Sequence, residues 1–268
     1  MDSSDPFTVS FIMRKSMNDN FLVKKGFTLI ELLVVIAIVS SLAALLLVSL
    51  ASAKGRASRS VCLNNLRQID LGIRMYSDDS RDVSPSPSSG AHITNAILYS
   101  YKTFVLNELG LTPASSQHSK LFSCPSDTFY YSPGDKPPYS GYTPQSEHDQ
   151  AFSLFSSYTF NGNEFTNLVA PYHGPAVRGI AGMKLSSIKH PAKTIMISEG
   201  PAIIPYSWHQ PKRPIANPQT CYFNNAMDMV GFVDGHVSYT KMYWDGDTNS
   251  LSMAYNPPEG YDYQWSGD

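Results

Sequence analysis

One long apolar run near the N-terminus constrains this chain more than any other feature. The run covers residues 27–51 and contains a single ionisable side chain, that of Glu31. As an α-helix with a rise of 1.5 Å per residue it is about 37 Å long, and the apolar core of a bilayer is about 30 Å thick. A soluble helix that is apolar on every face over this length is rare, because a globular domain covers only one face of most helices. The run therefore predicts one membrane-spanning helix.

Glu31 is expected to enter the membrane with this helix. A carboxylate inside a span costs up to about 3 kcal/mol, and less near the end of the span. The 16 Leu, Ile, Val and Phe residues of the run outweigh this cost, since each contributes about −0.3 to −0.6 kcal/mol. The buried carboxylate then needs a cationic partner, which has to come from another chain or from an amine created by processing.

Two kinds of N-terminal processing fit the flanks of the run. In the first, Lys24 and Lys25 form the basic region of a signal peptide and residues 51–53 form its cleavage site, which would release a secreted protein, such as a hydrolase, that starts at Lys54. The run is much longer than the usual apolar region of about 7–15 residues, however, and it carries a carboxylate near its start. In the second, cleavage falls before the run and the helix stays attached.

The sequence of residues 24–36, KKGFTLIELLVVI, decides between these alternatives. It closely resembles the leader and mature start of type IV prepilins and of the pseudopilins of type II secretion. The resemblance implies cleavage between Gly26 and Phe27 by a prepilin peptidase, followed by N-methylation of Phe27. It also implies a partner for Glu31, because in that family the glutamate at this position pairs with the N-terminal amine of a neighbouring subunit during filament assembly. A buried ammonium is the partner that a buried carboxylate requires.

The flanking charges do not orient the helix, because the four nearest basic residues before the run are matched by four after it. Orientation therefore rests on the resemblance, which implies a single-pass protein of the bacterial inner membrane with its head in the periplasm. The leader of residues 1–26 is long for the family, and a start at Met13 or Met17 would give a more usual length.

Beyond the run the helix is expected to continue to about residue 78. An apolar stripe recurs there at spacings of four, three, four and three, as on one face of a helix: Cys62, Leu66, Ile69, Ile73 and Tyr76. The residues between them form a polar face: Asn64, Asn65, Arg67, Gln68, Asp70 and Arg74. The stripe predicts packing against a domain of the same chain. The segment SPSPSSG at residues 84–90 then breaks the helix.

The rest of the chain is predicted to be a β-rich head. Its Pro, Gly, Tyr and Phe residues favour turns and aromatic strands. The predicted segments are a short helix near residues 99–109, long loops at 132–144 and 200–218, a buried strand at 194–198, and a hairpin whose strands, 229–233 and 236–239, flank a type I′ turn at Asp234 and Gly235.

The predicted fold class is therefore α+β, with a long N-terminal helix, membrane-spanning and then amphipathic, packed on an antiparallel β-rich, pilin-like head. The chain is predicted to divide into a leader (1–26), the helix (27–80) and the head (81–268).

Four motifs of the extramembrane part carry a second resemblance: CLNNLRQI at 62–69, CPSD at 124–127, SYTFNG at 157–162 and FVDGHV at 232–237. They resemble prepilin-like proteins with a C-terminal, processing-associated H-X9-DG motif. Asp234 and Gly235 match the DG of that motif, but Asn224 stands where the family has its histidine, so no role of that histidine transfers to this chain. His236 is expected to be a packed strand residue rather than a catalytic one.

The same resemblance implies a disulfide between Cys62 and Cys124, which would tie the head to the helix. Cys221 would then be a free thiol. The family pattern implies no enzyme activity, and the chain lacks the Gly-x-Ser-x-Gly and His-Glu-x-x-His motifs of common hydrolases.

The net charge and the candidate metal ligands bear on two further functions, nucleic-acid binding and calcium binding. The net charge of −2 argues against nucleic-acid binding through bulk charge. The oxygen-rich residues Asp245, Asp247 and Asn249 resemble the start of a calcium loop, but Asn256 stands where an EF-hand has its glutamate. Some type II secretion pseudopilins hold calcium in a C-terminal loop, so calcium is a possible ligand here and a polar turn is the alternative. No other cofactor is expected.

Two functions remain open beside the secreted hydrolase. The first is a structural subunit that assembles with other pilin or pseudopilin subunits. The second keeps the membrane anchor but makes the head a binding module for carbohydrate or an exported substrate, through exposed aromatic side chains that form stacking surfaces. The candidates for such a surface are Tyr206, Trp208, Tyr243, Trp244 and Trp265.

Overall fold

A computed structural model gives the fold and describes residues 26–86, 95–111, 120–133, 140–162, 177–210, 225–244 and 255–268. By its internal contacts the chain forms two compact units, residues 1–49 and residues 50–268. Helix α1 (Leu29–Asp79) belongs to both units, so the extramembrane part of the predicted helix is counted with the head.

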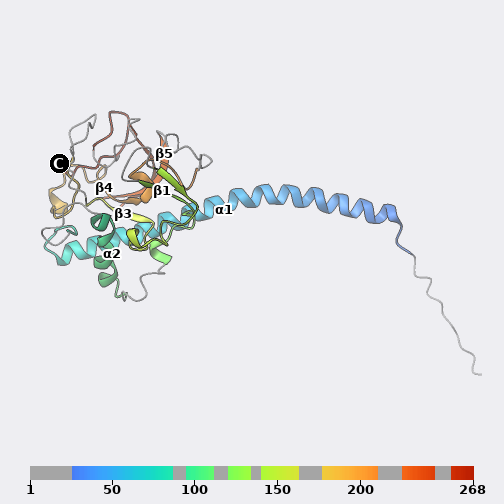
Figure 1. Cartoon of the computed structure of the whole chain (residues 1–268), viewed down its shortest axis with the longest axis horizontal. Coiled ribbons are helices and arrows are strands. Elements are labelled where there is room, and N and C mark those ends of the chain that lie inside the picture. Colours follow the sequence, from blue (N-terminus) through green and yellow to red (C-terminus); the bar gives the residue numbers. More distant parts are fainter. Residues whose placement is uncertain are drawn as a thin grey trace, which may run out of the picture. The chain divides into compact units, whose positions relative to one another are not determined.

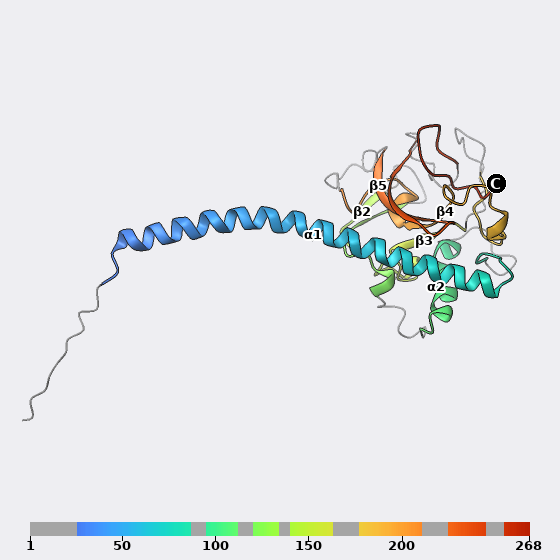
Figure 2. The same ribbon diagram turned by 180° about the vertical axis from the view of Figure 1, so that it is seen from behind.

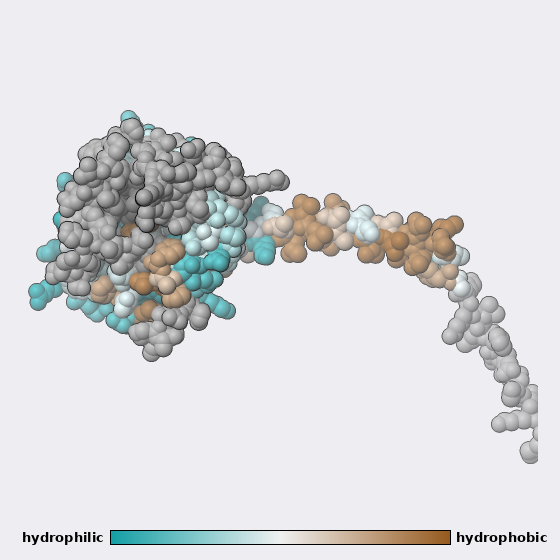
Figure 3. All heavy atoms as spheres, in the orientation of Figure 1, coloured by the Kyte–Doolittle hydropathy of each residue, from teal (hydrophilic) through white to brown (hydrophobic). Residues whose placement is uncertain are grey.

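The long N-terminal helix is confirmed, since α1 runs without interruption over 51 residues (Figure 1). Its part in the first unit carries apolar side chains that are exposed all round, and Figure 3 shows this stretch mainly in brown. In the described part of the chain, α1 is the one helix whose length and composition suit a membrane span. A surface of this kind is stable in lipid and not in water.

The head contains one further α-helix and two antiparallel sheets within the described residues, which confirms the α+β class. Their bounds are α2 (Asn95–Glu108), β1 (Tyr130–Pro133), β2 (Ser140–Thr143), β3 (Tyr158–Phe160), β4 (Ile195–Glu199), β5 (Ala226–Phe232) and β6 (Val237–Met242). Short 3₁₀ turns lie at η2 (Lys120–Phe122), η3 (Ala151–Ser153), η4 (Leu185–Ser187) and η5 (Gly200–Ala202).

The larger sheet has the strand order β3-β4-β5-β6, with every neighbouring pair antiparallel. Strand β4 is fully buried, as its run of apolar residues predicted. The smaller sheet pairs β1 with β2, and the end of β1 and all of β2 fall in the predicted loop of residues 132–144, so the prediction of a loop was wrong for these residues. Aromatic side chains explain the difference, because Tyr131 and Tyr142 of this hairpin pack against Phe129, and Tyr131 also against Tyr206.

The larger sheet is covered on both faces. One core cluster joins Leu66 and Ile73 of α1 and Val105 of α2 to Ile197 of β4. The second cluster joins Val230 of β5 to side chains of the C-terminal segment that include Trp265. Figures 1 and 2 show α2 beside the C-terminal part of α1.

The amphipathic stripe of α1 is largely confirmed. Cys62, Leu66, Ile69 and Ile73 are fully buried. Two residues assigned to the polar face, Asn65 and Asp70, are also buried, so their assignment was wrong. Asn65 has polar partners in the head, which a spacing pattern on one helix does not reveal, whereas Asp70 pairs with Arg74 of the same helix.

The hairpin of β5 and β6 is confirmed, but its turn is not of type I′. Gly235 adopts a positive φ of 96° and Asp234 does not, whereas a type I′ turn needs two such residues. The Gly235 N–H donates to the carbonyl oxygen of Phe232 at 2.8 Å, and the Phe232 N–H donates to that of His236 at 2.9 Å. This is a three-residue loop in which a left-handed glycine completes the turn.

Gly72 fixes how closely α1 and α2 approach, which gives a first prediction. A Cβ atom on Gly72 would lie 2.7 Å from Cγ1 of the buried Val105. Gly72→Ala should lower the free energy of unfolding by about 1–3 kcal/mol through overpacking. The measurement is denaturant unfolding of the micelle-bound chain, followed by tryptophan fluorescence.

Gly55→Ala is the matched control, because Gly55 lies in the same helix and a Cβ atom there meets nothing within 4 Å. It should leave stability unchanged or raise it by up to about 1 kcal/mol through helix propensity. Equal effects of the two substitutions would contradict the proposed close approach.

Candidate functional site

The predicted cleavage site lies just outside α1. Gly26 and Phe27 precede the first helical residue, and the Phe27 side chain is 70% exposed. Among the described residues, apart from its chain neighbours, no atom lies within 4 Å of the position that a Cβ would take on Gly26. The Gly26–Phe27 peptide bond is therefore non-helical and open, as a peptidase substrate has to be.

Glu31 and Thr28 form a reciprocal cap at the start of α1. The Thr28 N–H and hydroxyl each donate to Oε2 of Glu31 at 2.8 Å, and the Glu31 N–H donates to Oγ1 of Thr28 at 3.2 Å. Such a capping box satisfies amide groups that have no partner in the first helical turn, and it places a negative charge at the positive end of the helix dipole. It was not predicted, although Thr-x-x-Glu before an apolar run is its sequence signature.

The capping box uses only one carboxylate oxygen of Glu31. Both bonds that Glu31 accepts from Thr28 end on Oε2, and none to Oε1 is found within the described residues. Glu31 is also exposed. A second donor can therefore approach the carboxylate without first breaking the cap.

The head contains a second polar site, centred on the disulfide that the family resemblance implied. Cys62 of α1 is bonded to Cys124, which follows η2, with Cα atoms 5.2 Å apart. The bridge spans 62 residues, which is worth roughly 4 kcal/mol of stability in the chain-entropy model. It ties α1 to the head. Cys221 lies outside the described residues.

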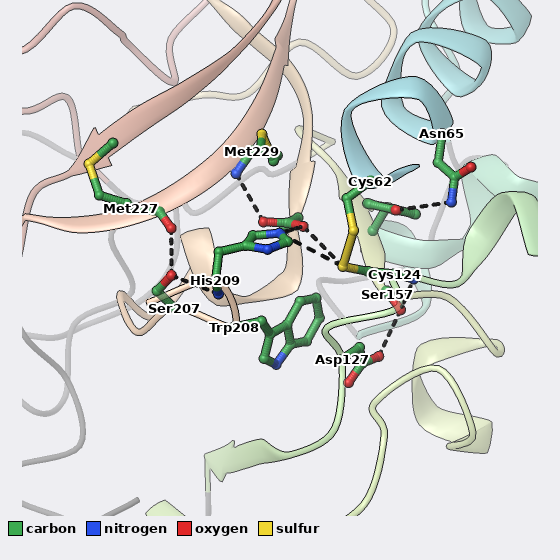
Figure 4. Close-up of polar contacts among 12 residues, drawn as sticks. Cys62, Asn65, Cys124, Asp127, Ser157, Ser207, Trp208, His209, Met227 and Met229 are labelled. Atoms are coloured by element: carbon green, nitrogen blue, oxygen red, sulfur yellow. Dashed lines mark hydrogen bonds and ion pairs between the residues drawn. A yellow bond between two sulfur atoms is a disulfide. The ribbon is translucent and has the colours of Figure 1, made fainter. Parts of the chain in front are cut away.

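A buried pair, Glu199 and His209, lies against this disulfide, and Figure 4 shows His209 of this pair next to Cys124. Oε1 of Glu199 is 2.8 Å from Nε2 of His209 and 3.3 Å from Sγ of Cys124. The exposed fractions of the His209 and Glu199 side chains are 1% and 0%. Neither residue was singled out from the sequence. The only signal was a glutamate at the end of a strand that is predicted to be buried.

The sequence motifs of the head meet around the same disulfide. Asp127 of the CPSD motif accepts bonds from the Ser157 hydroxyl and from the backbone N–H groups of Glu147 and His148, at 2.7–2.9 Å. The Ser157 hydroxyl in turn accepts from the Cys124 N–H at 3.0 Å. Burial raises the pKa of Asp127 to about 6. These motif residues position the chain around the disulfide.

Asn65 links another motif to this region. Its side-chain amide donates to the carbonyl oxygens of Lys120 and Ser123 and to the hydroxyl of Tyr158, at 3.0–3.2 Å. The predicted polar face of α1 therefore contributes a specific contact to the head.

The DG motif docks on α1. The Arg74 guanidinium donates to the carbonyl oxygens of Phe232 and Val233, next to the turn, and to Oδ2 of Asp70 at 2.8 Å. A Cβ atom on Gly235 would lie 3.2 Å from Nη2 of Arg74, so glycine leaves room for this contact.

The prediction of a packed strand residue at His236 was wrong, because His236 precedes β6 and its side chain is 45% exposed. Its ring stacks on Phe232 with centroids 4.2 Å apart, and Nδ1 lies 2.6 Å from Oδ1 of Asp234. These contacts give the DG motif a structural role. Asn224 and the calcium candidates Asp245, Asp247 and Asn249 lie outside the described residues.

The aromatic residues that motivated a binding surface are not exposed. Tyr206, Trp208 and Trp265 are buried, and Tyr243 and Trp244 are half-buried. The expectation of a stacking surface from these side chains was therefore wrong. They belong to the hydrophobic core of the head or pack against it.

Comparison with known proteins supports the N-terminal interpretation. Residues 23–47 match the family model described as the prokaryotic N-terminal methylation motif. The match supports a type IV prepilin-like N-terminus and does not extend to the H-X9-DG motif. No curated protein and no solved structure matches the chain.

Asp70 gives a pH-dependent prediction. Burial raises its pKa to about 6 in the folded chain, against an ordinary value of 3.8, in spite of the neighbouring Arg74. The folded state therefore keeps this proton at a pH where the unfolded chain has lost it. The contribution of Asp70 to the stability of the folded state is therefore complete below about pH 4 and is lost as the pH rises through about 6.

The unfolding free energy of the wild type minus that of Asp70→Asn should therefore fall between pH 4 and pH 7, by at most about 3 kcal/mol. Denaturant unfolding at several pH values measures it. Asp262→Asn, at an exposed residue, is the control. A difference that stays constant or rises with pH would refute the raised pKa of Asp70 in the folded chain.

Proposed function

We propose that this chain is a membrane-anchored structural subunit of a type IV pilus or of a type II secretion pseudopilus. A prepilin peptidase cleaves it between Gly26 and Phe27, Phe27 is N-methylated, and α1 then packs with the helices of other pilin subunits. The observation that carries the proposal is the prepilin-type motif at residues 23–47, which places one glutamate in the first turn of α1, at the start of an otherwise apolar stretch of that helix.

The geometry of the first turn supports a role of Glu31 in assembly. Before assembly, Thr28 satisfies one oxygen of the carboxylate. Cleavage creates a new ammonium group on Phe27, and the ammonium of a neighbouring subunit is the cation that the carboxylate needs in lipid. The pair would fix the axial register between neighbouring helices as well as hold them together, because each helix offers one such carboxylate in this turn.

The proposed location is the bacterial inner membrane, with one span and with the head in the periplasm. The disulfide between Cys62 and Cys124 is consistent with an oxidising compartment. The contacts of the head motifs support a structural rather than an enzymatic role, since they hold the fold together.

The first test of this proposal is the N-terminus of the mature protein. Mass spectrometry of the protein isolated from bacterial membranes should find a chain that begins at Phe27 and carries one additional methyl group on its amine. A mature chain that begins at Lys54 would instead establish signal-peptide processing and refute the proposal.

The second test is Glu31→Gln, which removes the charge and keeps the shape. Insertion should persist, because the apolar run is unchanged. Incorporation into filaments should fall by more than about a hundredfold, since breaking a buried ion pair costs about 3–5 kcal/mol. Quantitative immunoblotting of sheared filaments against membranes measures the ratio.

Glu259→Gln is the matched control for charge removal, because Glu259 is an exposed carboxylate of the head. It should leave incorporation unchanged. Normal incorporation of Glu31→Gln would exclude the proposed pairing of Glu31.

A further inference from the structure

Four side chains of metal-ligating types converge at the disulfide. They come from four separate parts of the chain: Cys62 from α1, Cys124 from the segment after η2, Glu199 from the end of β4, and His209 from the segment after η5. One ligand atom of each lies within 4.8 Å of the other three. All four side chains are buried, and Figure 4 shows the His209 imidazole beside the Cys124 sulfur.

The spacing suits a tetrahedral metal site. Ligand atoms around tetrahedral zinc lie about 3.3–3.8 Å apart, given Zn–N and Zn–S bonds of about 2.0 and 2.3 Å. Here Glu199 Oε1 is 3.3 Å from the sulfur of Cys124, His209 Nε2 is 3.9 Å from the same sulfur, and the oxygen and nitrogen are 2.8 Å apart. Changes of 1 Å or less in the distances between these three atoms would therefore make room for an ion among them.

The surroundings hold the two non-sulfur ligands in place. Oε2 of Glu199 accepts the N–H of Met229 at 2.9 Å, which leaves Oε1 directed at the cysteines. The Ser207 hydroxyl donates to the carbonyl oxygen of Met227 and accepts the N–H of His209 at 3.1 Å. Supports of this kind orient ligands in metal sites.

A disulfide alone does not explain the burial of this pair. A disulfide is an apolar group that needs no hydrogen-bonding partner, whereas burying a carboxylate and an imidazole is costly. Their placement is explained if the sulfurs can also exist as thiolates, which bind a cation together with the carboxylate and the imidazole.

We propose that Cys62, Cys124, Glu199 and His209 form a redox-gated site for a zinc-like divalent cation. While the cysteines form a disulfide, the site does not bind metal. When both are reduced, the two thiolates, one oxygen of Glu199 and Nε2 of neutral His209 complete a closed tetrahedral site. The proposal is independent of filament assembly.

The two states interconvert by thiol–disulfide exchange with a dithiol. The disulfide accepts two electrons and two protons and becomes two thiols, while the dithiol is oxidised to its own disulfide. Binding of the divalent cation then releases the two thiol protons to solvent. In reverse, an oxidising disulfide forms the Cys62–Cys124 bond and expels the cation. In both states α1 stays linked to the head at Cys62.

The ligand set also predicts selectivity. Thiolate and imidazole ligands favour Zn²⁺ and the spectroscopic probe Co²⁺. Ca²⁺ takes six to eight oxygen ligands, and this site offers a single carboxylate oxygen, so calcium should not compete.

Cobalt titration of the full chain in detergent micelles tests the proposal. Protein purified in a phosphine reductant should bind one Co²⁺ with thiolate-to-cobalt charge-transfer bands, and the oxidised protein should show none. Zn²⁺ should abolish the bands and excess Ca²⁺ should not. His209→Ala and Glu199→Gln should each weaken Co²⁺ binding at least tenfold, whereas Cys221→Ser and His190→Ala should leave it unchanged.

Charge-transfer bands that are missing in the reduced wild type, or that persist at full strength in both ligand variants, would overturn the proposal. X-ray absorption of the zinc-loaded, reduced wild type provides a test that needs no variant. It should find two sulfur and two nitrogen or oxygen ligands, and any other sulfur count would refute the assigned ligand set.

Discussion

One unbroken helix has to suit two different surroundings, and the rest of the structure depends on how α1 does so. In the first unit its apolar side chains are exposed on every face, which only lipid or other apolar helices can cover. In the second unit the apolar side chains of α1 lie on one face only, in the stripe of Leu66, Ile69 and Ile73, which is buried in the core of the head. No Pro interrupts α1, so the apolar segment and the stripe buried in the head belong to one continuous helix.

The attachment of the head to this helix rests on a few long-range contacts. Cys62 adds a covalent bond, Asn65 binds two carbonyl groups and a tyrosine hydroxyl, and Arg74 binds the strand end next to the DG turn. The motifs that resemble a prepilin-like family are therefore mainly the places where the head and α1 meet. This explains why they carry no recognisable catalytic pattern. Glu31 stands apart, since its cap involves only its own helical turn.

The sequence predicted what depends on local patterns. The apolar run, the stripe of α1, strand β4 and the paired strands around Asp234 each follow from spacing within one segment. The site at Glu199 and His209 was not predictable in this way, because neither residue has a motif and their meeting depends on the packing of distant segments. The strands β1 and β2 were missed because the glycine and proline residues of this segment favour a loop. The aromatic residues of the two strands contact one another only in the folded head. The burial of Asp70 was missed because it depends on Gly231 of β5, which lies against Asp70 only in the folded head.

The proposed function requires that α1 remain in the chain as a membrane anchor after processing. Alkaline carbonate extraction of membranes from the bacterium that produces this protein tests it directly. Carbonate strips peripheral proteins and leaves proteins with a membrane-spanning helix in the pellet. The processed chain is predicted to stay in the pellet and to enter solution only with detergent. Release of the processed chain by carbonate alone would contradict the account.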